Sequence, residues 1–103
     1  MVVNQDHKYN DKDIRLAKFV RALSHPARVA ILKYLKESGT CNCKNLVEKL
    51  PITQATVSQH LKELQDSGLI IANNKPPRVW YSVDNENWEM AKSMTMELMN
   101  LNF

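Results

Sequence analysis

Thr53-Gln-Ala-Thr-Val-Ser-Gln-His-Leu-Lys-Glu-Leu-Gln-Asp-Ser-Gly-Leu-Ile-Ile71 is the stretch of sequence that decides the fold of this chain. Its spacing predicts one helix that ends at Gly68 and leads directly into a strand. Three apolar residues recur at helical spacing and form one stripe, namely Val57, Leu61 and Leu64. The opposite face is small, hydrogen-bonding and basic, and it contains Ala55, Ser58, Gln59 and Lys62.

This second face has the properties that a helix in the major groove of DNA needs. Bulky side chains would block the approach, and a carboxylate would be repelled by phosphate. The simpler alternative is an ordinary solvated helix face, so the neighbouring elements have to decide between the two interpretations.

The segment before this helix predicts a helix-turn-helix. A brief helix containing Leu46, Val47 and Leu50 ends at Pro51, and Thr53 is placed to cap the helix that follows.

The segment after it predicts a β-hairpin. Residues 69–73 form a first strand, residues 74–77 a turn, and residues 78–83 a returning strand with alternating apolar side chains. A helix-turn-helix followed at once by a two-stranded ribbon is a winged helix. The chain is thus predicted to be mainly α with a β-hairpin wing (α+β).

Outside this unit, the pattern divides the chain into two parts. Residues 1–10 show no periodicity and are expected to form a flexible N-terminal arm, whereas residues 11–103 form the winged helix-turn-helix domain. A first amphipathic helix begins at Asp11. A second begins at Pro26, capped by His25 or Ser24, and stops near Gly39. Residues 40–43 are expected to be extended.

Composition limits the class of protein. The 103 residues fit one domain, and no apolar run is long enough to span a bilayer. The first six residues lack the features of a secretory signal, and two cysteines cannot form a disulfide framework. We therefore expect a cytoplasmic protein with no membrane association. Residues 84–103 are acidic, and the rest of the chain carries thirteen basic against seven acidic side chains, which suits a polyanionic partner.

Within this frame, individual DNA contacts can be assigned. We expect Ser58 and Gln59 to contact base edges, with Ala55 leaving room for their approach. Other contacts are expected with the phosphate backbone or at the start of the helix, from Lys62, Gln54 and Thr56 on the helix and from Lys75 and Arg78 at the tip of the hairpin.

At this point the sequence resembles a known family. Leu23-Ser-His-Pro-Ala-Arg-Val-Ala-Ile-Leu32, Cys41-Asn-Cys43 and Thr56-Val-Ser-Gln-His-Leu-Lys-Glu-Leu-Gln-Asp-Ser-Gly-Leu69 look like the ArsR/SmtB family of bacterial metal-responsive repressors. The resemblance covers roughly residues 14–100. It implies a homodimeric winged helix that binds double-stranded operator DNA and releases it when an effector binds.

The last helix supports a dimer independently of the resemblance, because it has two apolar faces and the domain's own core can cover only one. Two-fold symmetry would require a near-palindromic DNA site. The alternative is that residues 101–103 merely fray. The expected interface residues are Leu16 and Phe19 of the first helix and Trp88, Met90, Met94, Thr95, Leu98 and Met99 of the last.

The cysteine pair is the candidate sensor. In an extended segment Cys41 and Cys43 would point to one face, and thiolates favour zinc, cadmium, lead or arsenite. The family's sensing motif also has Cys-x-Cys here. However, Val47 stands where some members have a third thiol, and Lys44 stands where the motif usually has aspartate. An inert remnant and a redox switch are the alternatives, although a disulfide at this spacing would be strained.

Histidines add little to this candidate metal site. His7, on the N-terminal arm, is a weak candidate ligand. The favoured interpretation is that it is a solvated residue of this arm. His60 is interpreted as a packing residue and His25 as a helix cap. Residues 85–103 contain no histidine, so the family's alternative metal site on its paired C-terminal helices is not expected. Arg28 is either a phosphate contact or a tether between helices.

Two other classes of function fit the sequence less well. The sequence has no paired carboxylates or glycine-rich loop, so it does not predict an enzyme. A winged helix that binds proteins rather than DNA would more often expose aromatic side chains on the recognition helix.

Overall fold

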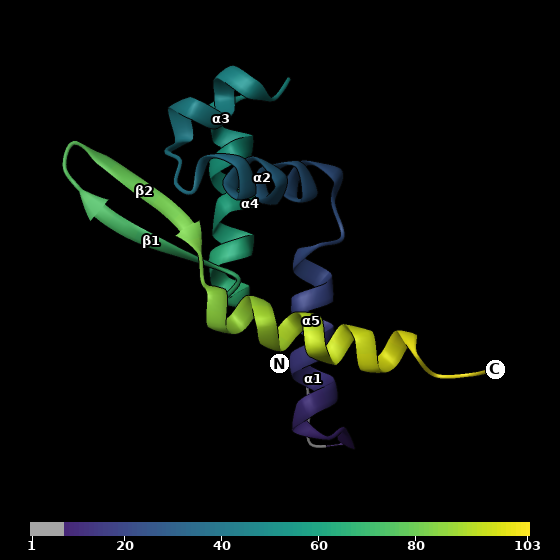
Figure 1. Ribbon diagram of the computed structural model, residues 1–103. Helices are drawn as coiled ribbons and strands as arrows, with labels where there is room; N and C mark the ends of the chain where they lie inside the picture. Colours follow the sequence, from purple (N-terminus) through teal and green to yellow (C-terminus); the bar gives the residue numbers. More distant parts are fainter. Residues whose placement is uncertain (1–7) are drawn as a thin grey trace.

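The computed structural model of the chain describes residues 8–103, so the predictions for His7 and most of the N-terminal arm lie outside the described residues. Five helices and one antiparallel hairpin follow one another, and the hairpin extends away from the helices (Figure 1). This arrangement confirms the predicted winged helix-turn-helix. The elements are α1 (Asp11–Ala22), α2 (Pro26–Ser38), α3 (Cys43–Lys49), α4 (Gln54–Ser67), β1 (Ile70–Lys75), β2 (Arg78–Val83) and α5 (Asn85–Met99).

Local side-chain chemistry sets where the helices begin. At the start of α2, His25 Nδ1 accepts a hydrogen bond from the backbone N–H of Ala27 at 3.0 Å, and Pro26 occupies the first turn. At the start of α4, Thr53 Oγ1 accepts from the backbone N–H of Thr56 at 3.4 Å. Both predicted caps are confirmed.

Gly68 ends α4 for two physical reasons. Its φ of 89° lies in the left-handed region, which side chains with a Cβ rarely adopt. A Cβ there would also lie 2.9 Å from Nδ2 of Asn87, which donates a hydrogen bond of 2.8 Å to the Gly68 carbonyl. The residue that turns the chain into the wing therefore also ties that turn to α5.

The hairpin is longer than the sequence predicts. β1 continues to Lys75, which pairs with Arg78, so only Pro76 and Pro77 remain in the turn. Asn73 ends the predicted first strand and Asn74 begins the predicted turn, and asparagine is less common in strands than in turns. Their pairing with Trp80 and Val79 across the ladder overrides that preference.

The segment at residues 40–43 is a second correction. Cys41 alone forms a bridge to β2, in which its N–H donates to the Tyr81 carbonyl at 3.1 Å and the Tyr81 N–H donates back at 2.7 Å. Cys43 is instead the first residue of α3. The reason is a capping box, in which the side chains of Asn42 and Asn45 each accept from the other residue's backbone N–H.

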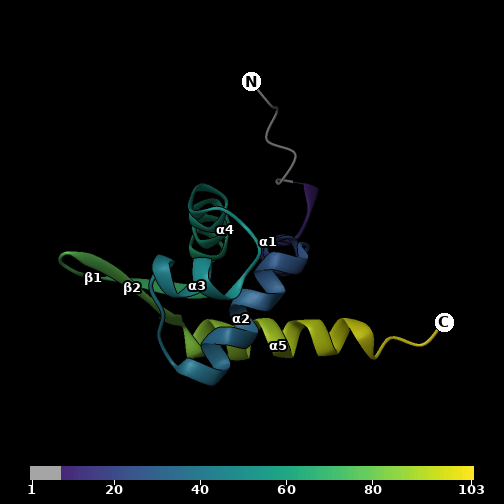
Figure 2. The ribbon, with the colours of Figure 1, turned by 90° about the horizontal axis from the view of Figure 1, so that it is seen from above.

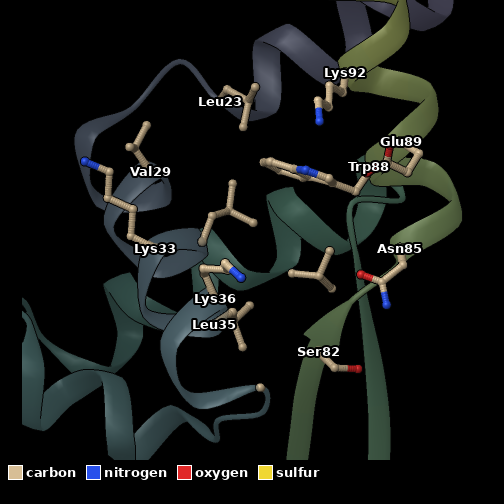
Figure 3. A pocket seen from close by; sticks show the side chains of 13 residues that line it. Leu23, Val29, Lys33, Leu35, Lys36, Ser82, Asn85, Trp88, Glu89 and Lys92 are labelled. Atoms are coloured by element: carbon tan, nitrogen blue, oxygen red, sulfur yellow. The ribbon is translucent and has the colours of Figure 1, made fainter.

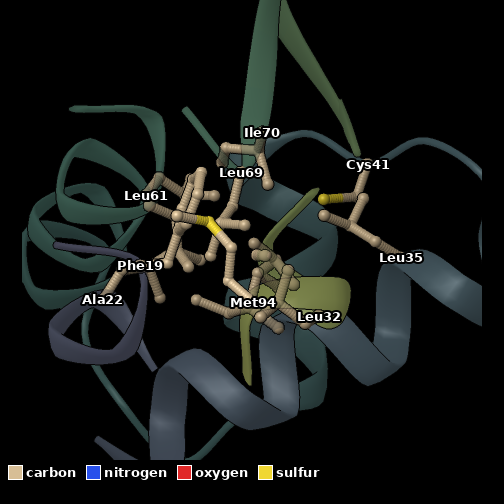
Figure 4. Packing of buried hydrophobic residues seen from close by; sticks show 14 residues of the cluster. Phe19, Ala22, Leu32, Leu35, Cys41, Leu61, Leu69, Ile70 and Met94 are labelled. Atoms are coloured by element: carbon tan, nitrogen blue, oxygen red, sulfur yellow. The ribbon is translucent and has the colours of Figure 1, made fainter. Parts of the chain in front are cut away.

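One hydrophobic core joins α1, α2, α3, α4, the hairpin and α5 (Figure 4). It contains the predicted apolar stripe of α4, the second helix of the helix-turn-helix, which is called the recognition helix below, since Val57, Leu61 and Leu64 are all buried. It also contains Phe19, which is 2% exposed, and Met94, which is 9% exposed. The prediction that these two side chains form a dimer interface is therefore corrected, because both lie within the core of the single chain. No helix in the described part of the chain is long and apolar enough to cross a membrane.

Candidate nucleic-acid interface and cysteine pair

The helix α4 presents one uninterrupted exposed face. Its core-facing stripe packs against the neighbouring helices, so the opposite side is left to solvent. All six residues expected to contact DNA from this helix are exposed, namely Gln54, Ala55, Thr56, Ser58, Gln59 and Lys62. None of them contributes to the core, so their chemistry is not explained by folding.

Two of these side chains have partners within α4. The Thr56 hydroxyl accepts a hydrogen bond of 3.1 Å from Thr53 Oγ1, next to the cap. Lys62 Nζ lies 3.5 Å from Asp66 Oδ2, one helical turn further on. Both members of this ion pair are largely exposed, so the pair is weak and the ammonium group can still turn toward a phosphate.

The hairpin β1–β2, called the wing below, carries basic residues at its tip. Lys75 and Arg78 face each other at the last pair of the ladder, and both are exposed. The two views show the tip standing away from the body of the molecule (Figures 1 and 2). A projecting basic tip of this kind can contact a phosphate backbone.

Arg28 is a tether between helices rather than an exposed cation. Its Nε donates to the Ala22 carbonyl at 2.7 Å, and its Nη2 donates to the Arg21 carbonyl at 3.4 Å. Its Nη1 lies 3.1 Å from Nδ1 of His60 on α4. The side chain thereby joins the end of α1, the start of α2 and the recognition helix, which resolves the alternative left open by the sequence.

His60 is buried, as predicted for a packing residue, and its ring stacks at a tilt on His25 with 4.3 Å between centroids. Burial lowers the pKa of His60, and the neighbouring His25 and Arg28 lower it further. A neutral imidazole is consistent with Nδ1 accepting from the Arg28 guanidinium.

The two cysteines lie in different environments. Cys41 is 0% exposed and sits beside Leu35 at the edge of the core (Figure 4). Burial, and to a lesser degree Cys43, raises the pKa of Cys41 to about 11. Cys43 is half-buried, and its Sγ lies 3.6 Å from Ser58 Oγ and 3.9 Å from the Gln54 carbonyl. The prediction that both thiols point to one face of a strand is therefore wrong.

The contact between Cys43 and the recognition helix could not be found by sequence reasoning. It joins residues 15 positions apart across the helix-turn-helix, and no local pattern indicates it. Because Ser58 is an expected base contact, the Cys43 thiol lies beside the surface that is expected to face DNA.

The described residues do not complete a metal site. Within residues 8–103, no three residues among His, Cys, Asp and Glu lie close enough together to hold an ion. A buried thiol with a raised pKa is also a poor ligand, because a metal binds the thiolate. The cysteine pair therefore does not fit a site with three or more ligands from this part of one chain.

Apart from Phe19 and Met94, the expected dimer residues divide into two groups. Leu16, Trp88 and Met90 are half-buried against the core, and the Thr95 hydroxyl donates to the Ala91 carbonyl at 2.7 Å. In contrast, Leu98 is exposed and Met99 is 71% exposed. Val20 and Met96, which are not among the expected interface residues, are also exposed and apolar.

Comparison with known proteins agrees with this geometry. Residues 23–71 match a family described as a helix-turn-helix domain. The chain is 34% identical over 70 residues to the HTH-type transcriptional regulator YgaV of Escherichia coli, a match that covers 68% of this chain and 71% of that protein. It is 31% identical over 71 residues to the arsenical resistance operon repressor of Staphylococcus xylosus, covering 69% of this chain and 67% of the repressor.

Solved structures show the same fold. The crystal structure of an ArsR family transcriptional regulator superposes with a TM-score of 0.73 at 21% identity, covering 84% of this chain and 89% of that chain. The matched relatives are named as transcriptional regulators, and none of the three is named as an enzyme. The winged helix, the exposed face of α4 and these relatives together show that the chain belongs to the ArsR/SmtB family of winged-helix transcriptional regulators.

Proposed function

We propose that this protein is a cytoplasmic, homodimeric repressor that binds a near-palindromic operator and inserts α4 into the major groove. The observation that carries the proposal is the exposed, polar face of α4, whose residues take no part in the core. Ser58 and Gln59 then contact base edges, while Lys62 and the N-terminal residues Gln54 and Thr56 contact the backbone.

The wing supports the same assignment. Lys75 and Arg78 extend the basic surface beyond α4, and no ion pair within residues 8–103 neutralises either of them. Cations at a projecting tip add affinity without sequence preference, because every phosphate is alike. α4 would supply specificity and the wing would supply affinity.

Exposed apolar side chains support the homodimer. Val20 on α1 and Met96, Leu98 and Met99 on α5 are exposed on two helices that share the hydrophobic core and are also linked by an exposed ion pair of 2.9 Å between Lys12 and Glu97. A second copy would cover this surface, and its two-fold axis would place two α4 helices on successive major grooves.

The test is binding to a duplex taken from the promoter of the protein's own gene, followed by fluorescence anisotropy at several salt concentrations. The dissociation constant should rise steeply with salt, and the promoter duplex should outcompete a duplex of shuffled sequence. Undetectable binding to the promoter duplex would favour the alternative, a winged helix used only for protein interactions.

A second candidate function is the sensing of a thiophilic ion. The ion would bind at Cys41 and Cys43 and cause the protein to release DNA. The supporting observations are the contact of Cys43 with Ser58 and the similarity to a repressor named for arsenical resistance. In this candidate Cys41 would have to leave the core and lose its proton, and any further protein ligand would come from residues 1–7, which include His7, or from a partner copy. A redox change of the same thiols is the competing signal.

The two signals can be separated on the protein–DNA complex. Zinc, cadmium, lead and arsenite are titrated separately into complexes of the wild type and of the Cys41→Ser/Cys43→Ser double variant. Release of the wild type but not of the double variant would support the ion-sensing candidate. If no ion releases DNA, or if both proteins respond equally, ion sensing by this cysteine pair fails.

A further inference from the structure

A large groove lies between α2, the end of β2 and the first half of α5, on surfaces that the proposed DNA contacts do not use. Its volume is about 990 Å³. The apolar part of its lining is formed by Leu23, Val29, Leu32, Leu35, Val83 and Trp88. The Trp88 indole extends from α5 across the groove toward α2 (Figure 3).

The edge of the groove is basic. Lys33, Lys36 and Lys92 line it, against one acidic residue, Glu89. In the close-up, the Lys36 and Lys92 amines turn into the groove from α2 and α5, whereas the Lys33 amine lies at its outer side (Figure 3). Within residues 8–103, ion pairs join Lys12 to Glu97 and Lys62 to Asp66, and none involves a lysine of the groove.

An apolar floor beside unpaired ammonium groups defines a class of ligand. We infer that the groove binds an organic anion with an apolar body, such as a medium-chain aliphatic carboxylate or an aryl carboxylate. The apolar body would displace water from the leucines and pack against the indole, while the carboxylate pairs with Lys36 and Lys92.

Other occupants fit less well. A small inorganic anion would leave the apolar floor exposed to water, and a cation would be repelled by the lysines. A second copy of the chain is the strongest competitor, because the groove-facing residues of α5 continue at helical spacing into the exposed Met96 and Met99. The lysines favour a ligand that carries its own carboxylate, since Met96 and Met99 have no charge and Glu97 of α5 is already paired with Lys12.

The experiment uses the tryptophan in the groove as the reporter. The chain has two tryptophans, so a Trp80→Phe background leaves Trp88 as the only one. Three probes are titrated without DNA: octanoate, which has both tail and charge, 1-octanol, which has only the tail, and acetate, which has only the charge. Octanoate should change the Trp88 emission saturably, with a dissociation constant at least tenfold lower than those of the other two probes.

Variants then test the charge. Lys36→Gln/Lys92→Gln should raise the dissociation constant for octanoate at least tenfold and leave that for 1-octanol unchanged. The matched control is Lys18→Gln/Lys49→Gln, which removes the same number of exposed lysines outside the groove and should have no effect. Circular dichroism and thermal unfolding of both double variants check that they are folded.

Three results would overturn the inference. They are the absence of a saturable change with octanoate, equal affinities for octanoate and 1-octanol, and equal affinities in the two lysine double variants. Binding of octanoate only after the dimer is disrupted by Met99→Glu would show that a second copy fills the groove, and it would overturn the inference as well.

Discussion

Arg28 Nη1 lies 3.1 Å from His60 Nδ1, which joins the start of α2 to the buried side of the recognition helix. The same guanidinium donates to the carbonyls of Ala22 and Arg21, and His25 stacks on the His60 ring. The position of α4 therefore depends on the neutral imidazole of His60, whose neighbours are the Arg28 guanidinium and the titratable ring of His25.

This relationship predicts a pH dependence of stability. The pKa of His60 in the folded protein is below its ordinary value of 6.5, with Glu63 the one neighbour that opposes the shift. Below pH 6.5 the unfolded chain binds a proton at His60 that the folded chain does not. The contribution of His60 to the free energy of unfolding is thus complete above pH 6.5 and is lost as the pH falls, by at most about 1.4 kcal/mol per pH unit for one proton.

Urea unfolding at pH 7.5, 6.5 and 5.5 measures this effect. Between pH 6.5 and 5.5, the free energy of unfolding should decrease less in His60→Gln than in the wild type. Part of the decrease should remain, because both proteins contain the other titratable groups. An identical decline in both proteins would show that His60 does not carry the effect.

Sequence preference should depend on Gln59. Gln59→Ala is expected to reduce discrimination between the operator and single-base variants by about 1–3 kcal/mol at the contacted base pair. Gln65→Ala is the matched control, because it removes another exposed glutamine side chain, six residues further along α4. Competition assays with operator variants measure both, and equal losses of discrimination would contradict the role of Gln59.

The wing should contribute to DNA affinity but not to sequence preference. Lys75→Ala is expected to weaken binding to operator and shuffled duplexes by similar factors. It should also reduce the slope of log affinity against log salt concentration by about one, which corresponds to one phosphate contact. Lys18→Ala on α1 removes an exposed lysine far from the wing in sequence and should leave both quantities unchanged. A loss confined to the operator duplex would instead assign Lys75 to base recognition.

Dimerisation should depend on the exposed surface of α5. Met99→Glu places a carboxylate on that surface and is expected to shift the protein toward monomers in sedimentation equilibrium. Ser93→Glu adds the same charge to an exposed position of α5 that lies one helical turn from both Glu89 and Glu97, and it should keep the wild-type mass distribution. If both variants have the same mass distribution, the interface lies elsewhere.

The two thiols should react at different rates. Cys43 is half-buried, whereas Cys41 is fully buried and its pKa is raised to about 11, so few thiolates form at neutral pH. Iodoacetamide at pH 7.5 should therefore modify Cys43 well before Cys41, and urea should remove the difference. Mass spectrometry of peptides from timed samples checks this, and comparable rates in the native protein would show that Cys41 leaves the core readily.

Some corrections show where sequence reasoning loses information. The capping box between Asn42 and Asn45 starts α3 at Cys43, and so separates a cysteine pair that its spacing alone placed on one face. In the same way, the sequence predicts a turn from Asn74, but pairing with β2 extends the strand to Lys75. In both places several weak local preferences competed, and a hydrogen-bond network decided between them.

The sequence by itself determined the order of the elements, the apolar stripe of α4, the caps at His25 and Thr53 and the turn at Gly68. These features follow from helical periodicity and from hydrogen bonds between residues close in the chain. The tertiary structure decided that Phe19 and Met94 are buried while Met99 is exposed, that Cys43 touches Ser58, and that α2 and α5 enclose a groove. Periodicity fixes the direction of a side chain about its own helix axis, but only the packing of the other elements decides what lies in that direction.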